Sequence, residues 1–440
     1  MLFIVIVAVV LLILQPFPVL HDYPEWMYQG HIVWSLITDS PTFTGHYELV
    51  LVPVPNAISQ SAIAALNGLT SPVAAGQIWL AIYFLLALVV GFIATRSHRH
   101  GGAMHLIFTL SIAFGPGFWN GYINFQFGLL FFALYIICAR KKAGSTLLFS
   151  LLIYFSHASV FAGFVCFVIV SEFFIQRRVR VFLALLPGLL LLLWYSVTKL
   201  SVGGGQNESV GSIAQWAQYK LYTLAKQGPF HNFIQSDGES LLATSHGLYM
   251  AGFVTNFLVA LLIGSYLLVT GFKFVRRQDG ALGRPLDSET YTPAVVVTML
   301  VLLVGYLLAG KNTFGVVNLG ERFLVVALML LILQVKCPGW IVKSWASLCI
   351  AFGIVTVSSL LVLSQGIGIY SADRSANTSE LESFVDDIYK NSRHKYFNHR
   401  IFIYTNLGQY LVSPDKFAGP PPVDHQSSIV RMRNRGATNE

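Results

Sequence analysis

The sequence predicts an all-α polytopic membrane protein with about 11 transmembrane helices, amphipathic helices on the outer face and a small extracytoplasmic C-terminal segment. The 440-residue chain is 55% hydrophobic and only 11% charged, whereas a typical soluble domain has about 25% charged residues. Runs of about 18 or more apolar residues, long enough for a helix to cross a bilayer, recur along the whole chain. The net charge of +8 therefore indicates membrane topology before it indicates nucleic acid.

Ten long apolar segments are expected to be spans. They are 1–20, 75–95, 103–119, 121–139, 158–176, 180–199, 249–272, 292–309, 323–335 and 344–365. An eleventh segment, 145–156, is short, and like 323–335 it needs flanking residues or tilt to cross a bilayer. Segment 1–20 lacks the basic region and small-residue cleavage site of a signal peptide, so we expect an uncleaved first span.

The positions of Lys and Arg orient these spans. With a cytoplasmic N-terminus and eleven crossings, the inner loops hold 14 of these cations and the outer loops between spans hold 5. This asymmetry follows the positive-inside rule. Because 140–142 and 177–180 are both basic, the chain between them should cross twice, with His157 at an outer hairpin or break. The C-terminus is then extracytoplasmic.

Three pieces are expected outside the bilayer: the two outer loops 21–74 and 200–247, and the chain after residue 365. The transmembrane domain covers 1–365 and includes both loops. A small extracytoplasmic segment follows at 366–418, and the Gly-, Pro- and polar-rich tail 419–440 is predicted to be disordered. In the first loop Asn56 is expected to cap a helix, and in the second Ser212 caps a helix that carries Trp216 toward the headgroup region.

Acidic residues appear directly after the first span, in the stretch HDYPEWMYQG that begins at His21. Asp22 should lie at the outer membrane interface, with Glu25 one helical turn later. A partly desolvated carboxylate there has a raised pKa and can act as a general base. The alternatives for Asp22 are a helix cap or a pair with His21.

Cations are rare in the outer loops, which makes Lys311 and Arg322 candidates for binding a lipid phosphate. A guanidinium offers bidentate contacts to phosphate oxygens. The alternative for Arg322 is a pair with Glu321 or an interaction with headgroups.

Amides at membrane depth form another group of candidates, in the stretch GPGFWNGYINFQFG that begins at Gly115. Asn120 and Asn124 need partners inside the bundle, so they either line a polar cavity or join helices to one another. A polar residue at His157, between two apolar segments, is a functional candidate by default. A hydrogen-bonded structural histidine is the alternative there.

The layout of nearly the whole chain resembles the GT-C superfamily of integral-membrane glycosyltransferases. An odd number of spans, an acid just after span one, a second outer loop with surface helices and an outward C-terminal piece carry the resemblance. HDYPEW, NGYINFQFGLL, FSHASVFAGF and GERFL also resemble segments of poorly characterised bacterial members. This chain has His-Asp where many members have two acids.

The resemblance implies a sugar transfer from a polyprenyl-phosphate donor to an envelope glycan or lipid acceptor, on the outer face of the bacterial inner (plasma) membrane. Asp22 would be the general base, with Glu25 as a second catalytic carboxylate. His21, Lys311, Arg322, His157, Asn120 and Asn124 are the expected substrate-binding residues. The alternatives are a glycan or lipid transporter and a non-catalytic partner in envelope polysaccharide assembly. No cofactor, metal or nucleic acid is expected: the four cysteines show no paired spacing, and the basic runs lack interleaved aromatic residues.

Overall fold

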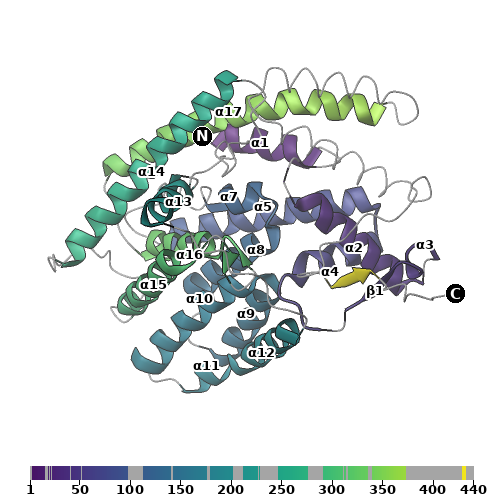
Figure 1. Cartoon of the computed structure of the whole chain (residues 1–440), viewed down its shortest axis with the longest axis horizontal. Coiled ribbons are helices and arrows are strands. Elements are labelled where there is room, and N and C mark those ends of the chain that lie inside the picture. The colour runs from purple at the N-terminus through teal and green to yellow at the C-terminus, as the bar shows by residue number, and fades with distance from the viewer. Residues whose placement is uncertain are drawn as a thin grey trace.

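The computed structural model describes most, but not all, of the chain. The described residues are 2–14, 18, 20, 22–39, 41–50, 52–97, 112–139, 142–175, 179–201, 212–225, 227, 246–275, 291–310, 312–313, 316–334, 339–372 and 429–432. Helices and strands carry the labels of Figure 1.

The described residues are mostly helical, which confirms the predicted class at this coarse level. Two π-helical stretches, η1 (Tyr135–Ala139) and η2 (Ile169–Ile175), continue helices α8 and α10. The α-helices are α1 (Leu2–Leu14), α2 (Tyr23–Ile37), α3 (Pro41–Thr44), α4 (Ala57–Asn67), α5 (Pro72–Ser97), α7 (Pro116–Trp119), α8 (Ile123–Leu134), α9 (Ala143–Ser156), α10 (Ala158–Val168), α11 (Val179–Leu183), α12 (Leu186–Ser201), α13 (Ile213–Ala225), α14 (His246–Val275), α15 (Tyr291–Leu308), α16 (Leu319–Gln334) and α17 (Gly339–Ala372).

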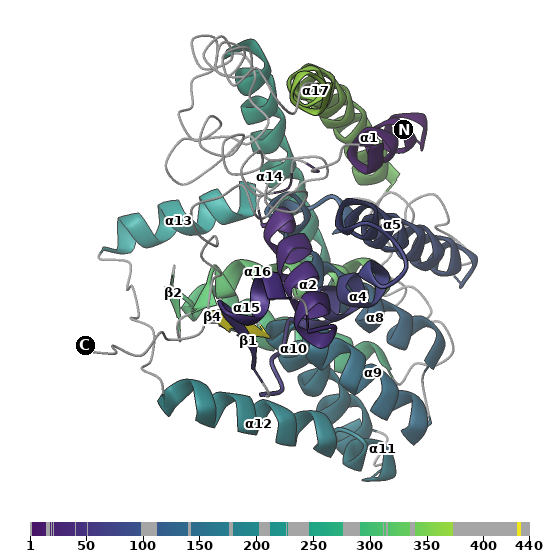
Figure 2. The ribbon, with the colours of Figure 1, turned by 90° about the vertical axis from the view of Figure 1, so that its right-hand side faces the viewer.

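Helices far apart in the sequence pack side by side. α1, α14 and α17 lie together at one end of the molecule, and α11 and α12 lie at the opposite end (Figures 1 and 2). Between them α8, α9, α10 and α16 form the middle of the bundle, with α15 packed along α16. The buried core is largely aromatic and aliphatic, with Trp119, Phe118 and Tyr83 among its largest fully buried side chains.

Three helical segments within the described residues are long and apolar enough to cross a membrane. They are Pro72–Arg96, Val179–Thr198 and Gly339–Leu361. Shorter apolar helices cover Phe3–Leu14, Ile123–Cys138, Ala143–Ser156, Ala158–Glu172, Met250–Tyr266 and Ala294–Leu308. The expectation of eleven spans is therefore met only in part. Most of the expected span 103–119 lies outside the described residues, as do most of the segment 366–418 and most of the tail.

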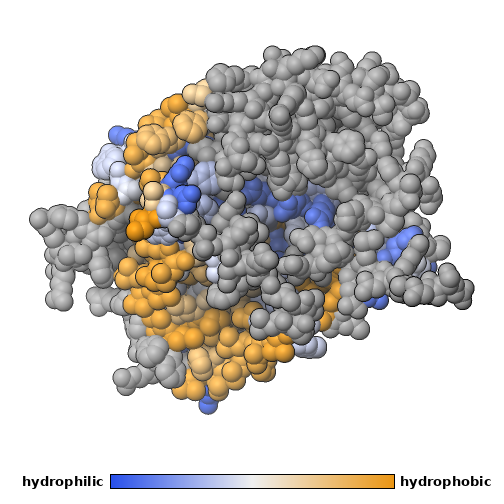
Figure 3. Space-filling model, viewed as in Figure 1, coloured by the Kyte–Doolittle hydropathy of each residue, from blue (hydrophilic) through white to orange (hydrophobic). Residues whose placement is uncertain are grey.

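Large apolar side chains remain exposed on several of these helices. On α12, for example, Leu190, Leu193 and Trp194 are each more than half exposed, at 64%, 60% and 55%. Described hydrophobic residues cover the lower left of the face in Figure 3, while hydrophilic residues gather near its middle. Contiguous apolar surface of this kind is unfavourable in water and indicates contact with lipid or with another protein.

Two short antiparallel sheets accompany the helices. β2 (Asn312–Thr313) pairs with β3 (Val316–Val317) just before α16. β1 (Tyr47–Leu49) pairs with β4 (Val430–Met432), so that Glu48 lies opposite Arg431. The sequence predicts disorder for 419–440, and the structure differs at 429–432, where backbone hydrogen bonds join the tail to the first loop. The rest of the tail lies outside the described residues.

Candidate functional site

The loop between α7 and α8 is hydrogen-bonded to the start of α2. The backbone nitrogen of Asp22 donates to the carbonyl oxygen of Asn120 at 3.1 Å. The indole nitrogen of Trp26, one turn into α2, donates to the carbonyl oxygen of Gly121 at 3.0 Å. Gly121 has a φ of +76°, and a Cβ atom there would lie 2.4 Å from the nitrogen of Asp22. The close approach of the two backbones therefore requires glycine at this position.

Asp22 occupies the N-cap position of α2, but its side chain makes no capping hydrogen bond. The alternative of a plain helix cap is therefore wrong for this carboxylate. Pro24 in the first turn favours the start of α2 at this point, because its fixed φ suits a helix and its missing N–H needs no partner. Glu25 lies one turn after the N-cap residue, and its Oε1 accepts from Gln29 Nε2 at 2.8 Å. The side chains of Asp22 and Glu25 are both partly buried, at the N-terminal end of α2.

Arg322, in the first turn of α16, also contacts this loop. Its guanidinium lies over the ring of Tyr122, 4.7 Å from the centroid. One of its terminal nitrogens lies 2.6 Å from Nε2 of His157. The Nε atom of Arg322 is buried and has no hydrogen-bond partner in the described part of the chain. The backbone of Asp22 and the guanidinium of Arg322 thus contact the same three-residue stretch of this loop, Asn120 to Tyr122.

His157 lies between α9 and α10 and is only 5% exposed. Its Nδ1 lies 3.1 Å from the nitrogen and 2.8 Å from the hydroxyl of Ser159, at the start of α10. The ring of Phe125 meets the imidazole edge-to-face. Burial, and then the positive charge of Arg322, hold the pKa of His157 well below its ordinary value of 6.5. The imidazole is therefore neutral at physiological pH.

The amphipathic helix α13 supports the end of α16 that carries Arg322. The hydroxyl of Tyr219 donates to Oδ1 of Asn318, the left-handed residue (φ 55°) that precedes α16. Lys220 is 6% exposed, and its ammonium donates to the carbonyl oxygen of Tyr306 and, at 2.7 Å, to that of Ala309. Burial lowers the pKa of Lys220 to about 8. A cation at the last carbonyls of α15 compensates unpaired acceptors and the helix dipole.

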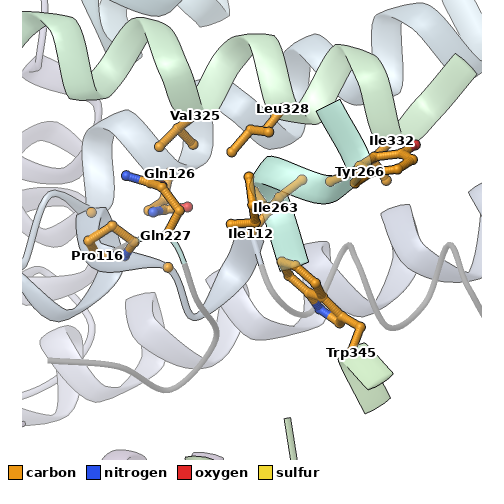
Figure 4. Close-up of a pocket in the computed structure, with 12 residues that line it drawn as sticks. Ile112, Pro116, Gln126, Gln227, Ile263, Tyr266, Val325, Leu328, Ile332 and Trp345 are labelled. Atoms are coloured by element: carbon orange, nitrogen blue, oxygen red, sulfur yellow. The ribbon is translucent and has the colours of Figure 1, made fainter. Parts of the chain in front are cut away.

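An apolar pocket begins at Val325, one helical turn after Arg322 along α16. It encloses about 540 Å³ of space, part of it open to solvent, and is lined by α16, α14 and α17, by the first turn of α8, and by α7 with the residues just before it (Figure 4). Three lining residues come from α16: Val325, Leu328 and Ile332. Gln126 and Gln227 supply polar groups on one side of the pocket, whereas Tyr266 and Trp345 line the opposite side (Figure 4).

The other predicted site residues have different outcomes. Asn124 is 2% exposed, and its Oδ1 accepts from the nitrogen of Ser59 in the first turn of α4 at 2.9 Å. It therefore joins helices, and it takes the capping role expected of Asn56, whose side chain makes no capping bond. Asn120 contributes its backbone carbonyl to Asp22. His21 and Lys311 lie outside the described residues.

Three residues of this region were not among the predicted site residues. Tyr122 and Ser159 sit in the predicted stretches, but nothing in their local sequence indicates contacts with Arg322 and His157. Lys220 looks like an ordinary cation of a surface helix in the sequence. Its burial depends on packing against α15, which the spacing of residues along α13 does not reveal.

Comparisons with known proteins give no further assignment of this site. No family model, curated protein or solved structure matches the chain. Among the described residues, no group of three or more His, Cys, Asp and Glu side chains is arranged to hold a metal ion.

Proposed function

We propose that the chain is a membrane glycosyltransferase that uses a polyprenyl-phosphate sugar, with Asp22 as general base and Arg322 as the cation for the donor phosphate. One observation carries the proposal: the backbone of Asp22 and the guanidinium of Arg322, 300 residues apart in the sequence, contact the same short loop, Asn120 to Tyr122. A transferase of this class needs a base for the acceptor and a cation for the leaving phosphate on the same site.

The apolar pocket supports a lipid-linked donor. Arg322, Val325, Leu328 and Ile332 fall within about a third of the circumference of α16, and about 15 Å separates the first from the last along its axis. Gln126 lies one turn after Tyr122, in the first turn of α8, and its backbone nitrogen donates to the carbonyl oxygen of Tyr122. A phosphate bound at Arg322 would therefore have an apolar path for its lipid tail along α16, from Val325 toward Ile332.

The proposed reaction is a single displacement. The Asp22 carboxylate accepts the proton of an acceptor hydroxyl while that oxygen forms a bond to the anomeric carbon of the donor sugar. The bond between the anomeric carbon and the phosphate oxygen breaks, and the polyprenyl phosphate leaves with the electron pair. Arg322 stabilises the negative charge of the leaving group. Glu25, held by Gln29, orients the acceptor hydroxyl.

The same proposal sets the chain in the inner membrane of a bacterium, with a cytoplasmic N-terminus and the site on the outer face. The three long apolar helices and the exposed apolar side chains of α12 support a bilayer environment. The pairing of β1 with residues 430–432 of β4 supports a first loop and a C-terminal segment on the same side of the membrane.

The test is transfer by the full-length protein in liposomes, with a panel of radiolabelled polyprenyl-phosphate sugars as donors. Asp22→Asn keeps the size of the side chain but cannot accept the proton, so turnover should fall by about 10²- to 10⁴-fold. The matched control is Asp39→Asn in the same loop. Asp39 is exposed and has a φ of 52°, a conformation that Asn also adopts readily, so this variant should keep full turnover.

Full turnover by Asp22→Asn, at unchanged protein level and thermal midpoint, would remove Asp22 from the mechanism. Movement of an intact donor across the liposome bilayer without sugar release would instead support the transporter alternative. Neither transfer nor translocation over the whole panel would favour a non-catalytic partner.

A further inference from the structure

The contacts of His157 cannot all be satisfied by a neutral imidazole. A neutral ring has one donor nitrogen and one acceptor nitrogen. The guanidinium of Arg322 has only donors, so Nε2, at 2.6 Å, must be the acceptor. Nδ1 then carries the proton and donates to the hydroxyl of Ser159. The backbone N–H of Ser159, 3.1 Å from the same Nδ1, faces a nitrogen that has no lone pair to offer.

The opposite tautomer fails as well. If Nδ1 accepts from the backbone of Ser159, Nε2 carries the proton, and two N–H groups oppose each other at the short contact with Arg322. A doubly protonated ring has the same conflict at Nε2 and adds charge repulsion. The hydroxyl of Ser159 can donate or accept and so suits either state of Nδ1. The guanidinium, which only donates, is the partner that favours an accepting Nε2 and a proton on Nδ1.

A guanidinium and two aromatic rings lie around the imidazole of His157 and its contact with Arg322. Arg322 approaches from α16, Tyr122 from the loop before α8 and Phe125 from the first turn of α8. Glu321, next to Arg322, is also buried, at 5% exposed. The positive charge of Arg322 is one cause of the low pKa of His157, and an anion bound to Arg322 would oppose that effect.

We propose that His157 is a second ligand for the donor phosphate and takes up a proton when the phosphate binds. Once the phosphate oxygens accept from Arg322, Nε2 of His157 no longer has to accept from the guanidinium. It takes one proton from solvent and donates to the same anion, while Nδ1–H remains on the Ser159 hydroxyl. The inference rests on the proposed function for its ligand, and it adds a residue and a coupled proton to that site.

The test measures proton uptake by isothermal titration calorimetry of the full-length protein in detergent, in two buffers with different heats of ionisation. The probe is dodecyl methyl phosphate, a phosphodiester like the proposed donor. It remains a monoanion near neutral pH, so uptake belongs to the protein. We expect about one proton per bound probe at pH 7, and affinity that falls up to about tenfold per pH unit between the low pKa of the free protein and the raised pKa of the complex. Dimethyl phosphate, without a lipid tail, distinguishes a free phosphate from a lipid phosphate.

Two variants make the test specific to His157. His157→Asn places a favourable N-cap residue before α10 but removes the Nε2 position, so uptake should vanish and binding should weaken. His157→Gln offers an amide near that position, so binding should persist without pH dependence.

Binding of the probe with no proton uptake would overturn the role of His157 and leave Arg322 as the phosphate ligand. Unchanged uptake in His157→Asn would overturn it equally. No binding to the wild-type protein, or undiminished binding to Arg322→Gln, would contradict the phosphate site of the proposed function itself.

Discussion

At the scale of single residues, the site depends on side chains that lie in unfavourable or unusual settings. A buried imidazole accepts from a guanidinium, a guanidinium Nε is buried with no partner among the described residues, and a glycine has a positive φ. Each setting costs free energy that the surrounding helices offset.

The stability of the protein should decrease as the pH falls below about 6.5, in part because of His157. The pKa of His157 is well below 6.5 in the folded chain and close to 6.5 in the unfolded chain. Between these values the unfolded chain binds a proton that the folded chain does not, so stability is present above pH 6.5 and is lost on acidification. The contribution is up to about 1.4 kcal/mol per pH unit. Thermal midpoints between pH 7.5 and 5.5 should fall less in His157→Gln than in the wild type. Equal slopes would contradict the prediction.

Replacement of Gly121 by alanine should damage both stability and turnover. Its Cβ atom would lie 2.4 Å from the nitrogen of Asp22 and 2.6 Å from that of Tyr23, at a φ of +76°. We expect a loss of about 1–3 kcal/mol in the free energy of unfolding, and turnover reduced beyond that loss because Asp22 is displaced. The control is Gly144→Ala in α9, where a Cβ atom meets no other atom within 4 Å, and its thermal midpoint should be unchanged or slightly raised. A Gly121→Ala protein as stable and active as this control would refute the steric argument.

At the scale of elements, the sequence predicts local features well. The helix after Ser212 forms as expected, and the cap is reciprocal: Ser212 Oγ accepts from the nitrogen of Gln215, and Gln215 Oε1 accepts from the nitrogen of Ser212. These partners are three residues apart, so the sequence contains the whole interaction. For α4 the sequence predicts Asn56 as the cap, whereas the structure shows Asn124, 65 residues from its partner Ser59, in that role.

The docking of α13 on α15 should depend on Lys220. Lys220→Met keeps an unbranched side chain of similar length but removes the donors to the carbonyls of Tyr306 and Ala309. Loss of these charged hydrogen bonds should lower the free energy of unfolding by about 2 kcal/mol, and proteolysis within 212–225 should become faster. The control Gln218→Met lies on the exposed side of the same helix and should change neither measurement. If Lys220→Met resists proteolysis like the wild type, α13 is held by other contacts.

At the scale of the whole molecule, two distant pairings close the fold. β4, near the C-terminus, pairs with β1 in the first loop, and Arg322 reaches His157 across 165 residues of sequence. The first pairing links the two ends of the chain, and the second links α16 to the hairpin between α9 and α10. Disruption of the second would separate Arg322 from His157 without changing any single helix.

The proposed topology predicts which side of the membrane two engineered cysteines occupy. In a variant whose four native cysteines are serine, Gly144→Cys lies beside the basic residues 140–142 and should react only from the cytoplasmic side. Ser212→Cys, at the start of α13, should react only from the outside. Both positions are exposed, so access to a membrane-impermeant maleimide, in right-side-out and inverted vesicles, reports the side directly. Labelling of both cysteines from the same side would refute the orientation and the count of crossings between them.

The sequence by itself determined the helical class, the local cap at Ser212, and the segments 75–95, 180–199 and 344–365, which overlap the long apolar helices Pro72–Arg96, Val179–Thr198 and Gly339–Leu361 of the structure. Apolar runs and caps act over a few neighbouring residues, so composition and spacing are sufficient to predict them. Only the tertiary structure decided that Asp22 meets Asn120, that Arg322 meets His157 and Tyr122, and that Lys220 is buried under α15. These contacts depend on how whole helices pack, and the free energy of packing is shared among many side chains far apart in the sequence.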